Sequence, residues 1–294
     1  MPPRTLCARD DRLRATVRSV AAHRPDCDDA NVTTDPLLER ARQLWADLAG
    51  APVTFMETAI TVATSPQSWL CPPGWVGIVA LGQAVIATAP DDETAELVRQ
   101  ALSDLPASAM IDAAAVRGRL PVQDELGPAT LAYCDAAAFR LLEAGTAEVG
   151  SPALNGPAVD GVALDPGKVE AIPADHADMS ALLARVPADD ADEAALSDIT
   201  SAAFVLRAGG DVVAAAGYRA WPRDTAHVSV LLTPAVRGRG LARIVAGAAV
   251  AHALDAGLFP QWRARPEASR RVARALGFRE LGSQLSIDLR PANR

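Results

Sequence analysis

A short loop rich in glycine and arginine, between a strand and a long helix, constrains this chain more than any other stretch. Alternating apolar residues predict a strand at 226–233, and "RGRG" follows at 237–240. Small apolar residues then predict a helix from about 239 to 256. Several backbone N–H groups at a helix start have no partner within the helix and point outward with the positive end of its dipole. Because Gly238 and Gly240 have no Cβ, the loop is typical of a phosphate site. An ordinary surface turn with two exposed arginines is the alternative.

The rest of the chain alternates strands and helices, which predicts a mixed α/β protein. In the first half, the periodicity of apolar residues predicts helices at 35–48 and 91–105, with three strands between them at 53–63, 75–81 and 84–89. In the second half, the predicted strands are 169–172, 201–207, 211–219, 226–233, 260–265 and 280–289. The predicted helices between them are 175–185, 189–198, 239–256 and 267–276.

Glycine and proline are concentrated between Gly145 and Pro173, which predicts a domain boundary there. A chain of 294 residues, 50% of them hydrophobic, is long enough for two domains. The predicted organisation has four parts, namely an N-terminal arm at 1–34, an α/β domain at 35–150, a linker at 151–168 and a second domain at 169–294.

Composition argues against several classes of partner. A formal net charge of −8 repels a phosphate backbone, so nucleic acid is not expected. The four cysteines are scattered and the four histidines form no ligand-like grouping, so we expect no metal site and no disulfide framework. No stretch resembles a signal peptide or reaches the roughly 18 apolar residues of a membrane span, so we expect a cytoplasmic protein without a membrane partner. Lys168 is the only lysine among 28 basic residues, a bias typical of a high-GC bacterial genome.

The loop and a downstream helix resemble the signatures of a known superfamily. Arg237-Gly238-Arg239-Gly240-Leu241-Ala242 resembles the R/Q-x-x-G-x-G/A loop of the GNAT superfamily of N-acetyltransferases. The stretch "PEASRRVARALGF" at 266–278 resembles the second signature, a helix that closes in Leu-Gly-Phe. The resemblance covers about 169–290 and is greatest to the branch typified by zwittermicin A resistance acetyltransferases. That branch is matched at Pro260, Trp262, Ala264, Ser269 and 276–278, whereas Pro266 replaces its asparagine.

The resemblance implies a GNAT-type sheet, mixed and mostly antiparallel, flanked by helices. The first domain repeats the order helix, strands, helix and is weakly similar to the front half of the same fold, as a degenerate GNAT-like half. Its strand-to-helix turn, "TAPDDET" at 88–94, is acidic where a phosphate loop is basic. We therefore expect this domain to shape an acceptor pocket and to bind no CoA.

The resemblance also implies acetyl-CoA as co-substrate, bound where the strands 226–233 and 260–265 diverge. The pantetheine arm would pair with the first of these strands, and the pyrophosphate would lie on the glycine loop. The implied cofactor-binding residues are Val230, Leu231, Leu232, Arg237, Gly238, Arg239, Gly240, Leu241, Ala242 and Ser269.

Catalytic residues are harder to assign. Superfamily members often place a carboxylate eight residues before the loop arginine, where this chain has Ser229. Strand alternation puts His227 on the same face, so His227 is a candidate base, directly or through water, with a structural role as the alternative. The tyrosine that often serves as general acid is replaced by Ala273, which leaves Tyr218 as the tyrosine nearest the site in sequence. The acidic segment at 189–193 either attracts a cationic amine or is a solvated helix start.

These features predict an acetyl-CoA-dependent N-acetyltransferase. It would move an acetyl group by direct transfer to a primary amine of a small molecule or peptide, with no metal, as a monomer or homodimer. An acyl-CoA-binding sensor or scaffold without turnover is the alternative.

Overall fold

The computed structural model describes residues 35–141, 158–159, 162–163 and 168–289. The predicted arm at 1–34 and most of the predicted linker lie outside the described residues. Within the described part of the chain, no helix is both long and apolar enough to cross a membrane.

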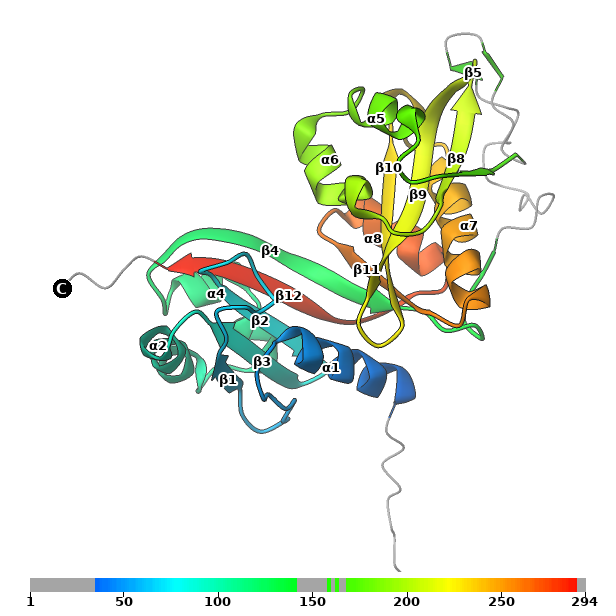
Figure 1. Cartoon of the computed structure of the whole chain (residues 1–294). Helices are drawn as coiled ribbons and strands as arrows, with labels where there is room; N and C mark the ends of the chain where they lie inside the picture. The colour runs from blue at the N-terminus through cyan, green and yellow to red at the C-terminus, as the bar shows by residue number, and fades with distance from the viewer. Residues whose placement is uncertain (1–34, 142–157, 160–161, 164–167, 290–294) are drawn as a thin grey trace, which may run out of the picture. The chain divides into compact units, whose positions relative to one another are not determined.

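The described residues form one ten-stranded sheet and a separate two-stranded ribbon (Figure 1). The sheet has the strand order β1-β3-β2-β12-β4-β11-β10-β9-β8-β7. The strands are β1 (Thr61–Thr64), β2 (Val76–Leu81), β3 (Ala84–Ala89), β4 (Val122–Tyr133), β7 (Glu170–Ile172), β8 (Ala203–Ala208), β9 (Asp211–Trp221), β10 (Thr225–Leu232), β11 (Phe259–Ala264) and β12 (Arg279–Leu289), with β5 (Ala158–Val159) and β6 (Val162–Ala163) in the ribbon. Among the described strands of this sheet, only β1 with β3 and β10 with β11 pair in parallel, so the predicted mixed and mostly antiparallel sheet is confirmed.

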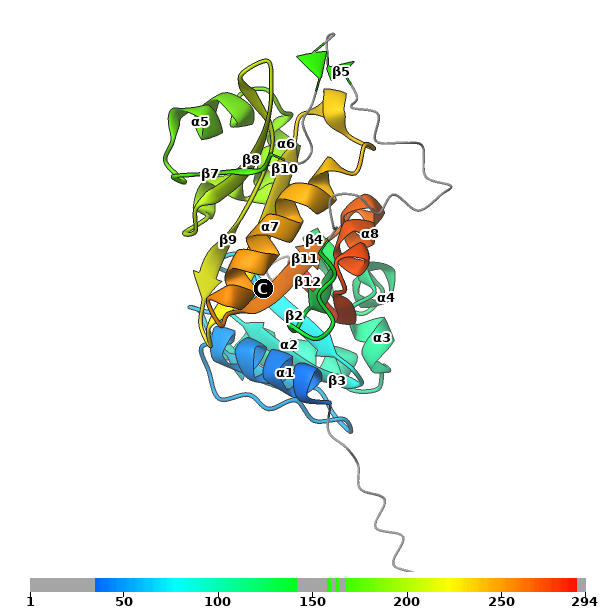
Figure 2. The ribbon, with the colours of Figure 1, turned by 90° about the vertical axis from the view of Figure 1, so that its right-hand side faces the viewer.

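Helices flank the sheet, as predicted, and they lie on both of its faces. The α-helices are α1 (Pro36–Leu48), α2 (Asp92–Leu102), α3 (Ala107–Met110), α4 (Ala113–Arg117), α5 (Ala177–Leu183), α6 (Ala188–Ala194), α7 (Leu241–Asp255) and α8 (Glu267–Ala275). In the second half, α7 packs on one face of β8, β9 and β10, while α5 and α6 cover the opposite face (Figures 1 and 2).

Local sequence explains why α1 forms where it was predicted. Asp35 caps its N-terminus by accepting a hydrogen bond from Leu37 N, and Pro36 occupies the first turn, where its missing N–H costs nothing. Residues spaced along one side of the helix are buried against the sheet. They are Leu37, Ala41, Leu44, Trp45 and Leu48.

Two predicted helices have different limits. The helix predicted at 189–198 is α6, which ends at Ala194, because Ala195 adopts a left-handed conformation with φ of 45° before a 3-10 turn at Leu196–Asp198. The long helix begins at Leu241 and not near 239, because Gly240 is itself left-handed, with φ of 78°.

The strand β4 was missed by the sequence analysis. It lies between β12 and β11 and pairs with both in antiparallel register. Gly127, Pro128 and neighbouring acids interrupt its apolar alternation, which hides the strand in the sequence. Since β4 precedes the predicted domain boundary and its neighbours follow it, strands from both predicted domains alternate in one sheet. The division into domains remains a prediction.

Candidate functional site

The neighbouring strands β10 and β11 separate part-way along their length. They pair at Thr225 with Phe259, at Ala226 with Pro260 and at His227 with Gln261, and the ladder ends there. Beyond this point β10 continues to pair with β9 as far as Leu232, and β11 with β4 as far as Ala264. Backbone amides on the facing edges therefore border a gap, and a ligand that carries amides can complete their hydrogen bonds.

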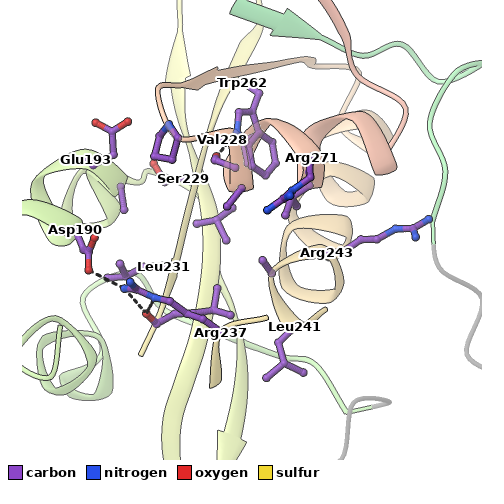
Figure 3. Close-up of a pocket in the computed structure, with 18 of the residues that line it drawn as sticks. Asp190, Glu193, Val228, Ser229, Leu231, Arg237, Leu241, Arg243, Trp262 and Arg271 are labelled. Atoms are coloured by element: carbon purple, nitrogen blue, oxygen red, sulfur yellow. Dashed lines mark hydrogen bonds and ion pairs between the residues drawn. The ribbon is translucent and has the colours of Figure 1, made fainter. Parts of the chain in front are cut away.

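A cavity of about 560 Å³ occupies this gap (Figure 3). The edge of β10 from His227 to Leu232 forms one wall, and the beginning of α7 with one side of α8 forms another. Asp190, Glu193 and Ala194 of α6 close the opposite side. The cavity therefore joins elements from both faces of the sheet.

The glycine loop is open toward this cavity. Gly238 and Gly240 have φ of 76° and 78°, a region that favours glycine. A Cβ added at either position would meet no heavy atom within 4 Å, and no side chain caps the start of α7. The uncapped N–H groups of a 15-residue helix next to empty space fit an anionic group.

Arginines surround the cavity on the side of α7 and α8. Arg243 of α7 and Arg271 of α8 line it, and the sequence analysis identified neither (Figure 3). The basic run of α8 at 270–274 was the available signal, but it did not show which arginine faces the site.

Arg237 has a structural contact that the sequence did not predict. Its Nη2 lies 2.7 Å from Oδ2 of Asp190 and donates to Leu232 O at 3.2 Å (Figure 3). It thereby links α6 to the end of β10. Arg239, also predicted to bind cofactor, is not among the residues that line the cavity.

The remaining predicted cofactor residues line the cavity. Val230, Leu231 and Leu232 lie on the edge of β10. Leu241 and Ala242 form the start of α7. Ser269 of α8 also lines the cavity, and its Oγ accepts a hydrogen bond of 3.0 Å from Nε1 of Trp262. This bond ties α8 to β11.

His227 is buried at the point where the strands separate, with 8% of its surface exposed, and it lines the cavity. Its Nδ1 hydrogen-bonds to Oε1 of Gln261, and Trp221 stacks on the ring with centroids 4.2 Å apart. Burial, followed by the nearby charge of Arg263, lowers the pKa of His227 to about 3. The imidazole is therefore neutral at any ordinary pH.

Gln261 is a site residue that the sequence analysis missed. It is fully buried, and the contact of its Oε1 with Nδ1 holds the ring of His227 in one orientation. Nothing in the sequence marks this residue, because its partner lies 34 residues away on another strand.

The other two candidate catalytic residues differ in position. Ser229 lines the cavity on the face of His227, and its Oγ donates to Ala195 O at 3.5 Å. Tyr218 does not line the cavity. Its hydroxyl lies 3.0 Å from Nδ1 of His252 on α7, on the other face of the sheet. The structure brings His227 and Ser229 together and leaves Tyr218 apart from them.

Residues 201–283 match the GNAT acetyltransferase family model. The matched segment contains β10, the glycine loop, α7, β11 and α8, which form most of the cavity. The match supports the predicted resemblance of this segment to the GNAT superfamily and an acetyltransferase activity for the protein. The zwittermicin-resistance branch stays a prediction, and no curated protein matches the chain.

Solved structures of GNAT proteins are similar at low identity. A GNAT-family protein of Novosphingobium aromaticivorans is 22% identical over 56% of this chain and 65% of its own, with a TM-score of 0.38. A GCN5-related N-acetyltransferase of Kribbella flavida is 16% identical over 60% of this chain and 62% of its own, with a TM-score of 0.41. A GCN5-related N-acetyltransferase-like protein of Streptococcus suis is 16% identical over 85% of this chain and 98% of its own, with a TM-score of 0.41. This chain spans less than two thirds of the first two, and the similarities are too low to indicate activity or substrate.

Proposed function

We propose that this protein is an acetyl-CoA-dependent N-acetyltransferase that acts on a primary amine by direct transfer. One observation carries the proposal. The edge of β10 that has separated from β11 runs directly into an uncapped helix start with two left-handed glycines. An amide-bearing chain that ends in phosphates matches both features together, and the segment lies within the GNAT match.

The charges on the side of α7 and α8 support CoA as the ligand. Backbone N–H groups of Gly240, Leu241 and Ala242 would hold the pyrophosphate, and the edge of β10 would pair with the pantetheine amides. Arg243 and Arg271 would add positive charge for the remaining phosphate. When bound, acetyl-CoA supplies an activated acetyl group and a thiolate leaving group.

His227 is the proposed proton acceptor. The hydrogen bond to Gln261 leaves Nε2 with the lone pair, and the stacked Trp221 restricts the ring. A base with a pKa of about 3 cannot deprotonate a free ammonium ion, so the amine has to arrive neutral. His227 would then receive the proton that the nitrogen loses as it forms the new amide bond. The backbone N–H of Leu232 would stabilise the developing negative charge on the acetyl oxygen.

A thioester-cleavage assay with a panel of primary amines tests this proposal. We expect release of free thiol that depends on amine, with one acetylated amine formed per thiol. Calorimetry on the full chain should show one CoA site. Binding of CoA without transfer to any amine would contradict an enzymatic role and favour the sensor or scaffold. Absence of CoA binding would contradict both.

A further inference from the structure

A further positive charge, that of Arg263, lines the cavity on the side away from α7 and α8. Along β11, Trp262 points toward α8, as its hydrogen bond to Ser269 shows. Successive side chains of a strand point to opposite faces, so Arg263 points toward the face that carries His227. Arg263 lines the cavity, and although part of the residue is exposed, burial of its guanidinium lowers its pKa.

Neutral groups hold Arg263 in position. Its Nη1 donates to Oε1 of Gln284 on β12 at 3.3 Å. Gln284 is buried, and its own Nε2 donates to the backbone oxygen of Leu70. An amide contact of this kind orients a guanidinium without neutralising its charge.

The neighbouring arginines, in contrast, have carboxylate partners. Arg237 pairs with Asp190, Arg265 with Glu193 and Arg219 with Asp198. Among the residues that the structure describes, Arg263 forms no direct ion pair. Glu193 attracts its charge from a greater distance and is itself paired with Arg265. The positive charge of Arg263 also acts on His227, because its repulsion of the imidazolium contributes to the low pKa of that side chain.

The phosphates of CoA have their own cationic groups on the other face, at the start of α7 and on α8. We infer that the acceptor is an amine that also carries a carboxylate, which pairs with Arg263 while its nitrogen faces His227. The planar guanidinium fork matches a carboxylate in bidentate geometry. One arginine without a direct ion-pair partner also balances one carboxylate charge, whereas a phosphate monoester carries about −1.5 to −2. This inference rests on the proposed function and refines its substrate class.

Matched pairs of amines test the inference on the full-length protein. Each pair consists of an amino acid, such as β-alanine or 4-aminobutyrate, and its carboxamide, which differs only in the missing charge. We expect wild-type kcat/KM to favour the acid by about 10- to 100-fold, the range for a hydrogen-bonded charge pair. In Arg263→Gln this preference should disappear, because kcat/KM for the acid falls to about the value for its carboxamide in the same variant. Arg263→Lys should restore part of the preference.

A charge-matched control separates direct contact from the general field of the protein. Arg219→Gln removes a positive charge from the same face but not from the cavity lining, so it should keep the wild-type preference. Calorimetry of the acids with the CoA-loaded protein, which cannot turn over, should show the same loss of affinity in Arg263→Gln. Thermal unfolding verifies that each variant is folded.

The outcomes separate this inference from the proposed function. Acetylation of amines without any preference for the acid, or with a preference that survives in Arg263→Gln, would overturn the inference and leave the transferase intact. An equal loss in Arg219→Gln would also overturn it. Failure to acetylate either member of any pair, or any amine of the earlier panel, would count against the transferase itself.

Discussion

The two halves of the molecule each contain a strand that turns into a helix, and the two turns end differently. After β3, Asp91 caps α2 with its own carboxylate, which accepts a hydrogen bond of 2.8 Å from Thr94 N. After β10, Gly240 caps α7 in a left-handed conformation and contributes no side chain. The first helix satisfies its N-terminus internally, whereas the second leaves its N-terminus available to an external anion.

The strands that precede these turns differ as well. In the first half, β3 pairs along its length with β2 on one side and has four paired residues with β1 on the other. In the second half, β10 separates from β11 after His227. An open strand edge and an open helix start thus occur together only in the second half of the described chain. The same strand-turn-helix arrangement can therefore form a closed turn, whose helix start is capped by a side chain, or an open turn, whose helix start is available to a ligand. The cap residue and the neighbouring strand decide which of the two forms.

The largest expected effect comes from closing the open turn with Gly240→Glu. The new side chain would place a negative charge where phosphate is expected to bind, so CoA affinity should fall by at least about 100-fold. Calorimetry and thermal shift with CoA measure it.

Gly210→Glu is the matched control for backbone strain. Gly210 also has a left-handed φ, of 95°, with no heavy atom within 4 Å of an added Cβ, but it lies in the turn between β8 and β9. Each variant should lose about 1–2 kcal/mol of stability from the left-handed backbone, and only Gly240→Glu should lose CoA binding. Equal CoA binding in both variants would show that the loop is an ordinary turn.

A smaller effect is expected from His227→Ala. Removal of a general base typically lowers turnover by about 10²-fold, while CoA affinity should stay the same. The pKa of about 3 means that His227 is already deprotonated above that pH. Its titration should therefore produce no acidic limb in the wild-type rate profile between about pH 5 and 8.

Gln261→Glu also tests the role of His227 as proton acceptor, by raising its pKa where His227→Ala removes the imidazole. A carboxylate beside Nδ1 favours the imidazolium, so the pKa of His227 should rise and an acidic limb should move up in pH. Tyr218→Phe is a useful companion, because a loss as large as that of His227→Ala would support the catalytic role that sequence suggested for Tyr218. Near-normal turnover in His227→Ala would leave His227 with a structural role.

The smallest effect belongs to the closed turn. Asp91→Ala removes the cap of α2 and should cost about 1 kcal/mol of unfolding free energy, measured with urea. CoA affinity should not change, because the turn after β3 is expected to bind no CoA. A change in affinity comparable to that of Gly240→Glu would contradict the contrast between the two turns.

The sequence by itself determined the features that depend on neighbouring residues. Asp35 and Pro36 start α1, and a pair of glycines with a following run of small residues predicts the turn and helix at β10 and α7. These signals are local, because caps and left-handed glycines act within a few residues. Residue periodicity likewise placed His227 and Ser229 on one face.

Tertiary structure alone decided the rest. The strand β4 becomes visible only through its partners β11 and β12, more than a hundred residues later in the chain. The charge state of His227 depends on burial and on Gln261, and Arg263 has no direct ion-pair partner among the described residues, while Glu193 pairs with Arg265. Such properties arise from packing between remote segments, where burial and electrostatic fields add over all neighbours in space, so no stretch of sequence specifies them alone.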